Sequence, residues 1–147
     1  MAKAKYNLQR AFRKLMLDFQ RCSLIPSMYR YKLLKLAGIK IHGKPFIGQD
    51  VIFDSMAPEN IEIEDGARIT MRSIILTHFY NPNGQEKYPI GKVHIGRFAF
   101  IGANSIVCKP VSIGDYSTVA AGAVVTKDIP PRQIWRGVPA HFIKEEK

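Results

Sequence analysis

The sequence lacks the long apolar runs and the dense cysteines that mark several protein classes. No stretch approaches the roughly 18 apolar residues of a membrane span, and the basic N-terminus has no apolar segment like that of a secretory signal. The two cysteines, Cys22 and Cys108, form no metal-ligand pattern, so we expect free thiols in a cytosolic (cytoplasmic) protein. At 147 residues, 46% of them hydrophobic, the chain fits a single folded unit.

Acidic residues are nearly absent from the first 44 positions. Eleven Lys or Arg stand there against Asp18 alone, which accounts for the whole net charge of +10 and leaves the remainder neutral. Apolar residues recur at helical spacing, and a second helical run over 27–36 stops before Gly38. We predict that residues 1–38 form two basic amphipathic helices, separated near Pro26, whose apolar face caps the rest of the chain. The apolar residues of the first helix are Leu8, Phe12, Leu15, Met16 and Phe19.

The excess of positive charge leaves three interpretations open for the N-terminal segment. A basic amphipathic helix can lie on an anionic membrane surface, which would place residues 1–25 at the inner face of a membrane. It can also bind an acidic polymer, or be a solvated helix face with no partner. Because the segment has no base-reading motif, we do not expect nucleic acid as a partner.

An aliphatic residue occupies every sixth position over a long part of the chain. Mostly small residues follow four positions later, and glycine directly follows three of the aliphatic residues, where a corner needs a backbone free of Cβ constraint. A period of six fits neither a helix nor a strand and is typical of a solenoid repeat. The unbroken run is Ile95, Ile101, Val107, Ile113, Val119 and Val125, with glycines at 96, 102 and 114.

The same spacing continues upstream and gives twelve hexads. Three short strands joined by tight corners close one triangular coil, and stacked coils pair every backbone edge with the next coil. We therefore predict a mainly β fold, a parallel β-helix of about four coils over residues 39–147, with a short C-terminal helix. Equivalent residues should stack in ladders, such as Ile95 over Ile113 and Ile101 over Val119. The four groups of three hexads are 41–58, 63–80, 95–112 and 113–130.

Two interruptions break the period of six. About four extra residues stand near 56–60, and a larger break follows Ile75. Residues 79–92 include Asn-Pro-Asn-Gly and a later Pro and Gly, which are strong turn signals. A loop of this length in a compact repeat is usually functional or disordered, so we expect a protruding loop at 79–92. His78 stands immediately before it.

The hexads, the break after a histidine, and two motifs resemble those of the hexapeptide-repeat acyltransferases. The motifs are Ile-Gly-Ala-Asn-Ser at 101–105 and a tail formed by residues 121–131 and 137–140. The chain is most similar to the maltose, galactoside and capsular-polysaccharide O-acetyltransferase branch, over about residues 38–144. The resemblance implies a left-handed β-helix, a homotrimer, acetyl-CoA as the donor, and active sites in clefts between adjacent subunits.

His78 matches the histidine at the base of the protruding loop in this family, and the resemblance implies that it is the general base. A sugar hydroxyl is a poor nucleophile at neutral pH, and a neutral imidazole can take its proton as it attacks the thioester carbonyl. No acyl-enzyme is needed when both substrates meet in one cleft. The orienting partner of His78 stays open, with Glu62 and Glu64 as candidates.

The resemblance also implies residues that bind the donor. Ala103 and Ala121 match positions where the family's backbone contacts the pantetheine arm of CoA. Thr126 and Lys127 match the site that meets the nucleotide end. Lys144 matches a basic position associated with the phosphates, which lysine binds as a point charge.

For the acceptor, the resemblance points to one strand end and to the loop. Asp54 aligns with a polar family position near the sugar hydroxyls. Phe100 stands where relatives often have tryptophan, so it would form an altered wall of the cleft. The loop residues that could line the same cleft are Tyr80, Asn81 and Tyr88.

These observations predict an acetyl-CoA-dependent O-acetyltransferase that modifies a saccharide, such as a cell-surface polysaccharide precursor, without a metal. The acceptor and the acyl chain length stay open. One alternative is an antibiotic or other xenobiotic O-acetyltransferase, and another is a non-catalytic trimeric scaffold that binds an anionic partner through the basic N-terminus. Zinc carbonic anhydrases share the β-helix, but the four histidines include no His-x4-His pair.

Overall fold

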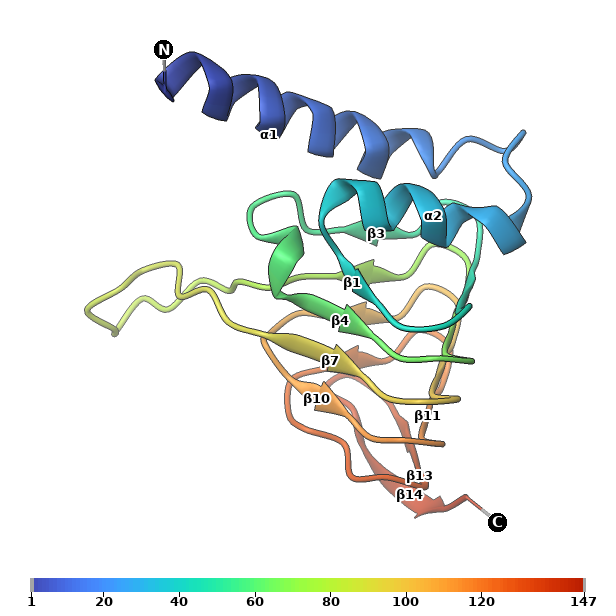
Figure 1. The fold of residues 1–147 in the computed structure, drawn as a ribbon. Coiled ribbons are helices and arrows are strands. Elements are labelled where there is room, and N and C mark those ends of the chain that lie inside the picture. Colours follow the sequence, from blue (N-terminus) through green and yellow to red (C-terminus); the bar gives the residue numbers. More distant parts are fainter. Residues whose placement is uncertain (1, 147) are drawn as a thin grey trace.

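The computed structural model describes residues 2–146, with side chains described from residue 8 onward. The chain forms a parallel β-helix with helices at one end and a hairpin at the other (Figure 1). Twelve strands of two or three residues build four coils, so the predicted groups of three hexads are confirmed. The coils contain β1 (Lys40–Ile41), β2 (Phe46–Ile47) and β3 (Ile52–Phe53); β4 (Ile61–Ile63), β5 (Arg68–Ile69) and β6 (Ile74–Ile75); β7 (Val93–Ile95), β8 (Phe100–Ile101) and β9 (Ile106–Val107); and β10 (Ser112–Ile113), β11 (Thr118–Val119) and β12 (Val124–Val125).

Each coil contributes one strand to each of three parallel sheets. Sheet A contains β1, β4, β7 and β10; sheet B contains β2, β5, β8 and β11; and sheet C contains β3, β6, β9 and β12. The register pairs Ile95 with Ile113 and Ile101 with Val119, which confirms the predicted ladders. These four side chains are fully buried. The hexad aliphatics therefore form a core that runs along the axis of the stacked coils.

Two of the corners between the sheets matter for the site. The B–C corner, which joins sheet B to sheet C, contains residues 48–51, 70–73, 102–105 and 120–123. The C–A corner contains residues 54–60, 76–92 and 108–111, and residues 126–128 continue it below the last coil. Both interruptions of the period lie at the C–A corner: the short 3-10 helix η1 (Pro58–Asn60) fills the first, and the predicted loop 79–92 protrudes from the second (Figure 1).

The glycines that follow the hexad aliphatics are required by the spacing between coils. A Cβ on Gly102 would lie 2.4 Å from the backbone nitrogen of Ala121 in the next coil, too close for any contact. The left-handed backbone of this corner falls instead on Asn104, with φ of 57°. The expected freedom from a Cβ is thus confirmed, but its reason is close approach between coils and not the turn conformation.

Two helices cover the first coil. Helix α1 (Ala2–Phe19) lies across the end of the stack, and α2 (Ser27–Ala37) lies between α1 and the first coil (Figure 1). Leu34 and Ala37 of α2 are fully buried, and the helix ends at Gly38 in the left-handed conformation, with φ of 102°. Neither helix, over the residues that the structure describes, is long and apolar enough to cross a membrane.

The apolar face of α1 points the other way from our prediction. Leu8, Phe12, Leu15 and Phe19 are exposed, and only Met16 of the predicted set is partly buried. The face that meets the protein contains Leu17 and Met16, and Arg13 on α1 bonds Glu59 of the C–A corner. The capping role that we assigned to the apolar face therefore falls to α2 and to the opposite face of α1.

The C-terminal segment is a hairpin, not the short helix that we predicted. Strand β13 (Gln133–Arg136) pairs in parallel with β11, and β14 (His141–Glu145) returns antiparallel to it. The last coil would otherwise leave the edge of sheet B unpaired, and a helix cannot satisfy those backbone groups. Ile134 and Trp135 also favour an extended backbone.

Candidate functional site

His78 lies beside a buried carboxylate. Nδ1 of His78 is 2.6 Å from Oδ2 of Asp54, and the side chain of Asp54 is 3% exposed against 25% for that of His78. Oδ2 of Asp54 also accepts hydrogen bonds from the backbone N–H and the hydroxyl of Thr77, at 2.9 and 2.7 Å. Oδ1 accepts one from the N–H of Met56 at 2.8 Å. Four donors therefore surround one carboxylate.

These donors stabilise the charged form of Asp54, and the charged carboxylate in turn fixes the tautomer of His78. Burial opposes the charge of Asp54, but hydrogen bonds from Met56, Thr77 and His78 outweigh it and hold the pKa of the carboxyl below its ordinary value. An ionised carboxylate can only accept, so Nδ1 of His78 carries the proton and donates it. In the neutral ring Nε2 then keeps its lone pair, and it has no hydrogen-bond partner among the described residues.

The stacking of the first two coils builds this pair. Strands β3 and β6 pair in register, Phe53 against Ile75, so the residues that follow them meet at the C–A corner. Asp54, which we expected beside the acceptor, contacts His78 directly, and its place near an acceptor stays a prediction. Glu62 and Glu64, our candidates for the orienting partner of His78, contact His42 and His94.

The hexad register itself contained a signal for this pair. Asp54 follows Phe53 directly, and Thr77 and His78 follow Ile75 by two and three positions. Since the coils stack, these positions are neighbours across the coil boundary. Our sequence analysis did not use this offset, and it did not single out Thr77.

A groove of about 540 Å³ lies on sheet B and the B–C corner. It brings together three residues predicted from the family motif, Phe100, Ala103 and Ala121. The sequence analysis missed the other side chains that line it, because outward-facing positions of a coil carry no periodic signal. These residues are Ser27, Phe46, Gln49, Thr70 and Met71, together with Gly48 and Gly102.

The remaining predicted residues lie at other places on the surface. Thr126 is partly buried and Lys127 exposed, both just after β12 at the C–A corner. Lys144 is exposed on β14 beside sheet B. On the loop, the rings of Tyr80 and Tyr88 are 5.5 Å apart between centroids.

The loop is closed at its base by backbone contacts. The N–H of Asn81 donates to the carbonyl of Lys87 at 2.8 Å, so Asn81 helps to hold the two sides of the loop together. His78 forms an antiparallel bridge with Ile90. The catalytic candidate therefore sits at the root of the loop.

One chain does not bring all these groups to one place. His78, Thr126 and Lys127 belong to the C–A corner, whereas Ala103 and Ala121 belong to the B–C corner. These are different edges of the triangular stack. A cleft that holds both sets requires a second copy of the chain.

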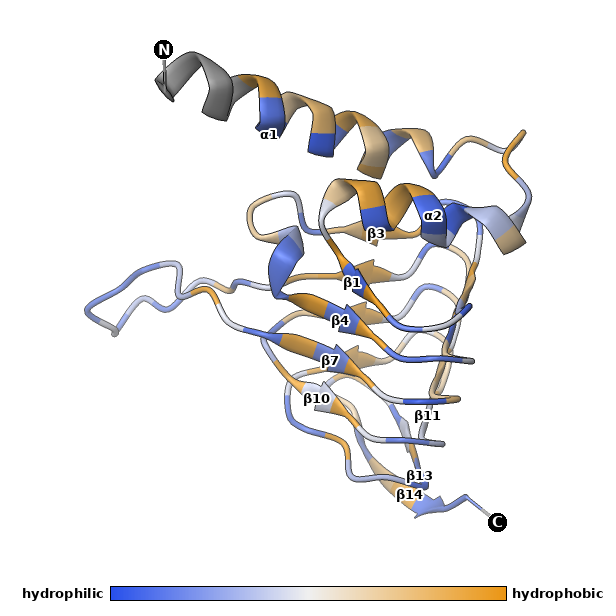
Figure 2. Ribbon diagram, viewed as in Figure 1, coloured by the Kyte–Doolittle hydropathy of each residue, from blue (hydrophilic) through white to orange (hydrophobic). Residues whose placement is uncertain are grey.

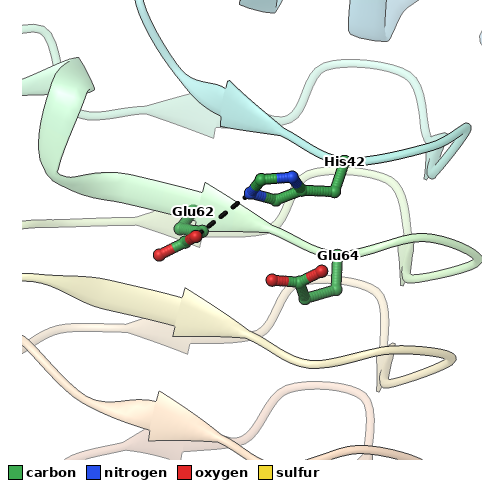
Figure 3. A group of neighbouring side chains, drawn as sticks. All are labelled: His42, Glu62 and Glu64. Atoms are coloured by element: carbon green, nitrogen blue, oxygen red, sulfur yellow. Dashed lines mark hydrogen bonds and ion pairs between the residues drawn. The ribbon is translucent and has the colours of Figure 1, made fainter.

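One group of described side chains has the atoms to hold a metal ion: His42, Glu62 and Glu64 (Figure 3). Nε2 of His42 is 3.1 Å from Oε1 of Glu62. The Lys92 ammonium pairs with the same carboxylate, and this contact holds the pKa of Glu62 below its ordinary value. The negative charge of Glu62 is already neutralised by lysine, so we assign the cluster to ion pairing on the surface of sheet A.

The repeat matches a known family model. Residues 92–127 match the family described as bacterial transferase hexapeptide (six repeats). The chain is 34% identical over 88 residues to the galactoside O-acetyltransferase of Escherichia coli strain K12, a match that covers 59% of this chain and 42% of that protein. The chain spans about half or less of the length of the curated relatives it matches.

Solved structures show the same fold. A hexapeptide-repeat acetyltransferase from Vibrio cholerae, in complex with acetyl coenzyme A, aligns with a TM-score of 0.72 at 21% identity and covers 99% of this chain and 91% of that one. A maltose O-acetyltransferase from Clostridium difficile aligns with a TM-score of 0.66 at 22% identity and covers 95% and 87%. Neighbours of this kind are left-handed β-helices, which confirms the predicted fold class.

The pKa of Asp54 predicts a pH-dependent stability. The pKa of Asp54 is lower in the folded chain than in the unfolded chain, where it has its ordinary value of about 3.9. The ionised carboxylate therefore stabilises the fold at pH values above this ordinary pKa. The contribution is lost as the pH falls through the pKa of the folded chain. In urea unfolding, Asp54→Asn should lower the free energy of unfolding strongly at about pH 6 and progressively less toward about pH 2. The exposed Glu86→Gln is the control. An equal loss at every pH would contradict the assignment.

Proposed function

We propose that the chain, whose residues 92–127 match the hexapeptide-repeat family and whose fold is a left-handed β-helix, is an acetyl-CoA-dependent O-acetyltransferase. The acceptor in this proposal is a hydroxyl group of a saccharide. The observation that carries it is the contact of His78 with the ionised Asp54 at 2.6 Å. An ionised carboxylate that holds the imidazole with Nδ1 protonated leaves the lone pair of Nε2 available, which is the arrangement that a general base requires.

His78 acts as the general base in this mechanism. Asp54 holds the ring with Nδ1 protonated, so Nε2 takes the proton from the acceptor hydroxyl while its oxygen attacks the acetyl carbonyl. The imidazolium that forms is stabilised by the adjacent carboxylate. As the tetrahedral intermediate collapses, His78 returns the proton to the departing thiolate of CoA, and the ring is neutral again. No acyl-enzyme is required.

The groove on sheet B supports acetyl-CoA as the donor. Its walls are mostly apolar, and Ala103 and Ala121 leave the backbone open to the narrow pantetheine arm. Lys127 and Lys144 are exposed and can meet the phosphates at the nucleotide end. The Vibrio cholerae structure of the same fold was solved with acetyl coenzyme A.

The protruding loop supports a saccharide acceptor. Tyr80 and Tyr88 are both exposed, and their rings lie close to each other on the loop that follows His78. Such side chains present an apolar face and a polar edge, as a sugar does. An antibiotic acceptor would call for a longer loop than 79–92, so we favour the saccharide.

The same residues support a homotrimer. The base and the groove lie at different edges of one stack, and a cyclic arrangement of identical copies places the C–A corner of each against the B–C corner of its neighbour. Three equivalent clefts result. Each contains His78 from one subunit and Ala103 and Ala121 from the next.

Replacement of His78 tests the mechanism. His78→Ala should lower the turnover number for acetyl transfer by about 10²- to 10⁴-fold, measured as CoA release with a panel of sugars, lipid-linked glycans and antibiotics. The matched control is His94→Ala, because His94 has a similar side-chain exposure of 31% and also contacts a carboxylate.

Three results would contradict this proposal in different ways. Full turnover in the His78→Ala variant would show that His78 is not the general base, although the chain would still be an acetyltransferase. If the chain neither binds acetyl-CoA nor releases CoA with any acceptor, the proposed acetyltransferase activity is wrong. Release with an antibiotic but with no glycan would replace the saccharide as acceptor.

Mixing two inactive variants tests the shared cleft. Ala103→Tyr should block the groove, and His78→Ala lacks the base, so each alone should be inactive. Refolded together in equal amounts, a cyclic trimer has both intact residues in about a quarter of its clefts. Activity of the mixture near that fraction supports the cleft between subunits, whereas no recovery would place the whole site within one chain.

A further inference from the structure

Helix α1 carries an uncovered apolar stripe. Leu8, Phe12, Leu15 and Phe19 follow each other at steps of four, three and four residues, so they lie on one face of the helix. Their exposed fractions are 73%, 46%, 58% and 53%. Figure 2 shows α1 as the outermost layer at its end of the molecule, with no other described element beyond it. We call these four residues the α1 stripe.

Contacts of the turn that follows α1, and of the helix face opposite the stripe, fix this orientation. The side-chain amide of Gln20 donates to the carbonyl of Val51 at 2.7 Å in a fully buried position. Arg21 bonds Asp50 through Nε and Nη2, at 2.8 and 2.6 Å. Leu17 is buried on the same side. The helix is therefore held with the stripe turned outward, and the exposure is a property of the fold.

Positive charge is concentrated in the segment that contains the stripe. The first 44 residues carry eleven basic residues against Asp18, whereas the rest of the chain is neutral. Lys14 is exposed on α1 itself, and Lys32 and Lys35 are exposed on α2. Arg10 is also exposed, but it faces the 54–60 corner on the other side of α1. Several exposed apolar residues extend the same end of the molecule, among them Leu24, which is 87% exposed, and Met28, which is 64% exposed.

We propose that the α1 stripe docks onto an anionic phospholipid bilayer. A helix with an apolar stripe lies in the plane of a membrane with that face among the acyl chains, and nearby lysine and arginine bind the acidic headgroups. The complementary charge selects this partner: an apolar protein groove would bind the stripe but would not require the excess of basic residues in the helical segment.

The geometry of the fold suits this docking. Helix α1 lies across the end of the stack, so with α1 in the membrane plane the coils stand upright and the hairpin β13–β14 points away (Figure 1). In the proposed trimer the clefts run along the coil corners, so all three α1 helices lie at the same end. This step alone rests on the proposed function; the stripe and its charge do not. Membrane docking would place the clefts beside a lipid-linked saccharide.

Vesicle flotation with the full-length chain tests the docking. The probe is vesicles of phosphatidylcholine with phosphatidylglycerol, and vesicles of phosphatidylcholine alone are the reference. Phe12→Ser with Phe19→Ser should weaken binding to the anionic vesicles by about tenfold or more. The matched control is Phe142→Ser at the other end of the molecule, since Phe142 and Phe12 are both 46% exposed. Lys14→Gln should weaken binding by about fivefold.

Each outcome decides the proposal. Binding that needs the anionic lipid, falls with added salt and is lost in the stripe variant supports it. No binding, or binding that the stripe variant retains, overturns it. If the parent chain does not float and the stripe variant changes the oligomeric state in light scattering, the stripe lies between copies of the chain. This outcome also overturns the proposal. His78→Ala should float like the parent chain, so a failure of the enzyme proposal leaves this test intact.

Discussion

The stacking of the coils in register is the constraint on which the rest of this molecule depends. No strand is longer than three residues within the four coils, so each coil is stable only because its neighbours satisfy its backbone groups. The N–H of Arg68 donates to Ala99 in the next coil, and that of Phe100 donates to Ser117. A shift by one residue would turn the aliphatic ladder outward, so the register is strongly determined.

The same register positions the chemistry. Asp54 follows the last strand of the first coil, and Thr77 and His78 follow the last strand of the second. Asp54 and His78 are distant in sequence, but Oδ2 of Asp54 lies 2.6 Å from Nδ1 of His78. The rigid coils fix the ring and its tautomer. The chain leaves the register directly after His78, so the loop that it forms can vary without moving the imidazole.

The sequence alone was enough to predict the coils, the ladders and the protruding loop, because an aliphatic residue at every sixth position has one place in a triangular coil. It did not predict the contact of Asp54 with His78, because Asp54 follows Phe53 by one position whereas His78 follows Ile75 by three, so a comparison of equivalent hexad positions does not pair them. The C-terminal hairpin depends on the open edge beside β11, which is a tertiary requirement. The apolar period of α1 shows which residues share a face but not which way that face turns.

The account rests on Asp54 acting through His78, and a double-mutant cycle tests this directly. The measurement is the rate of acetyl transfer for His78→Ala, for Asp54→Asn, and for the chain with both changes. If the carboxylate works only by holding the imidazole, the doubly changed chain should be no slower than His78→Ala alone. If the two losses multiply, Asp54 acts independently of the histidine and the account is wrong.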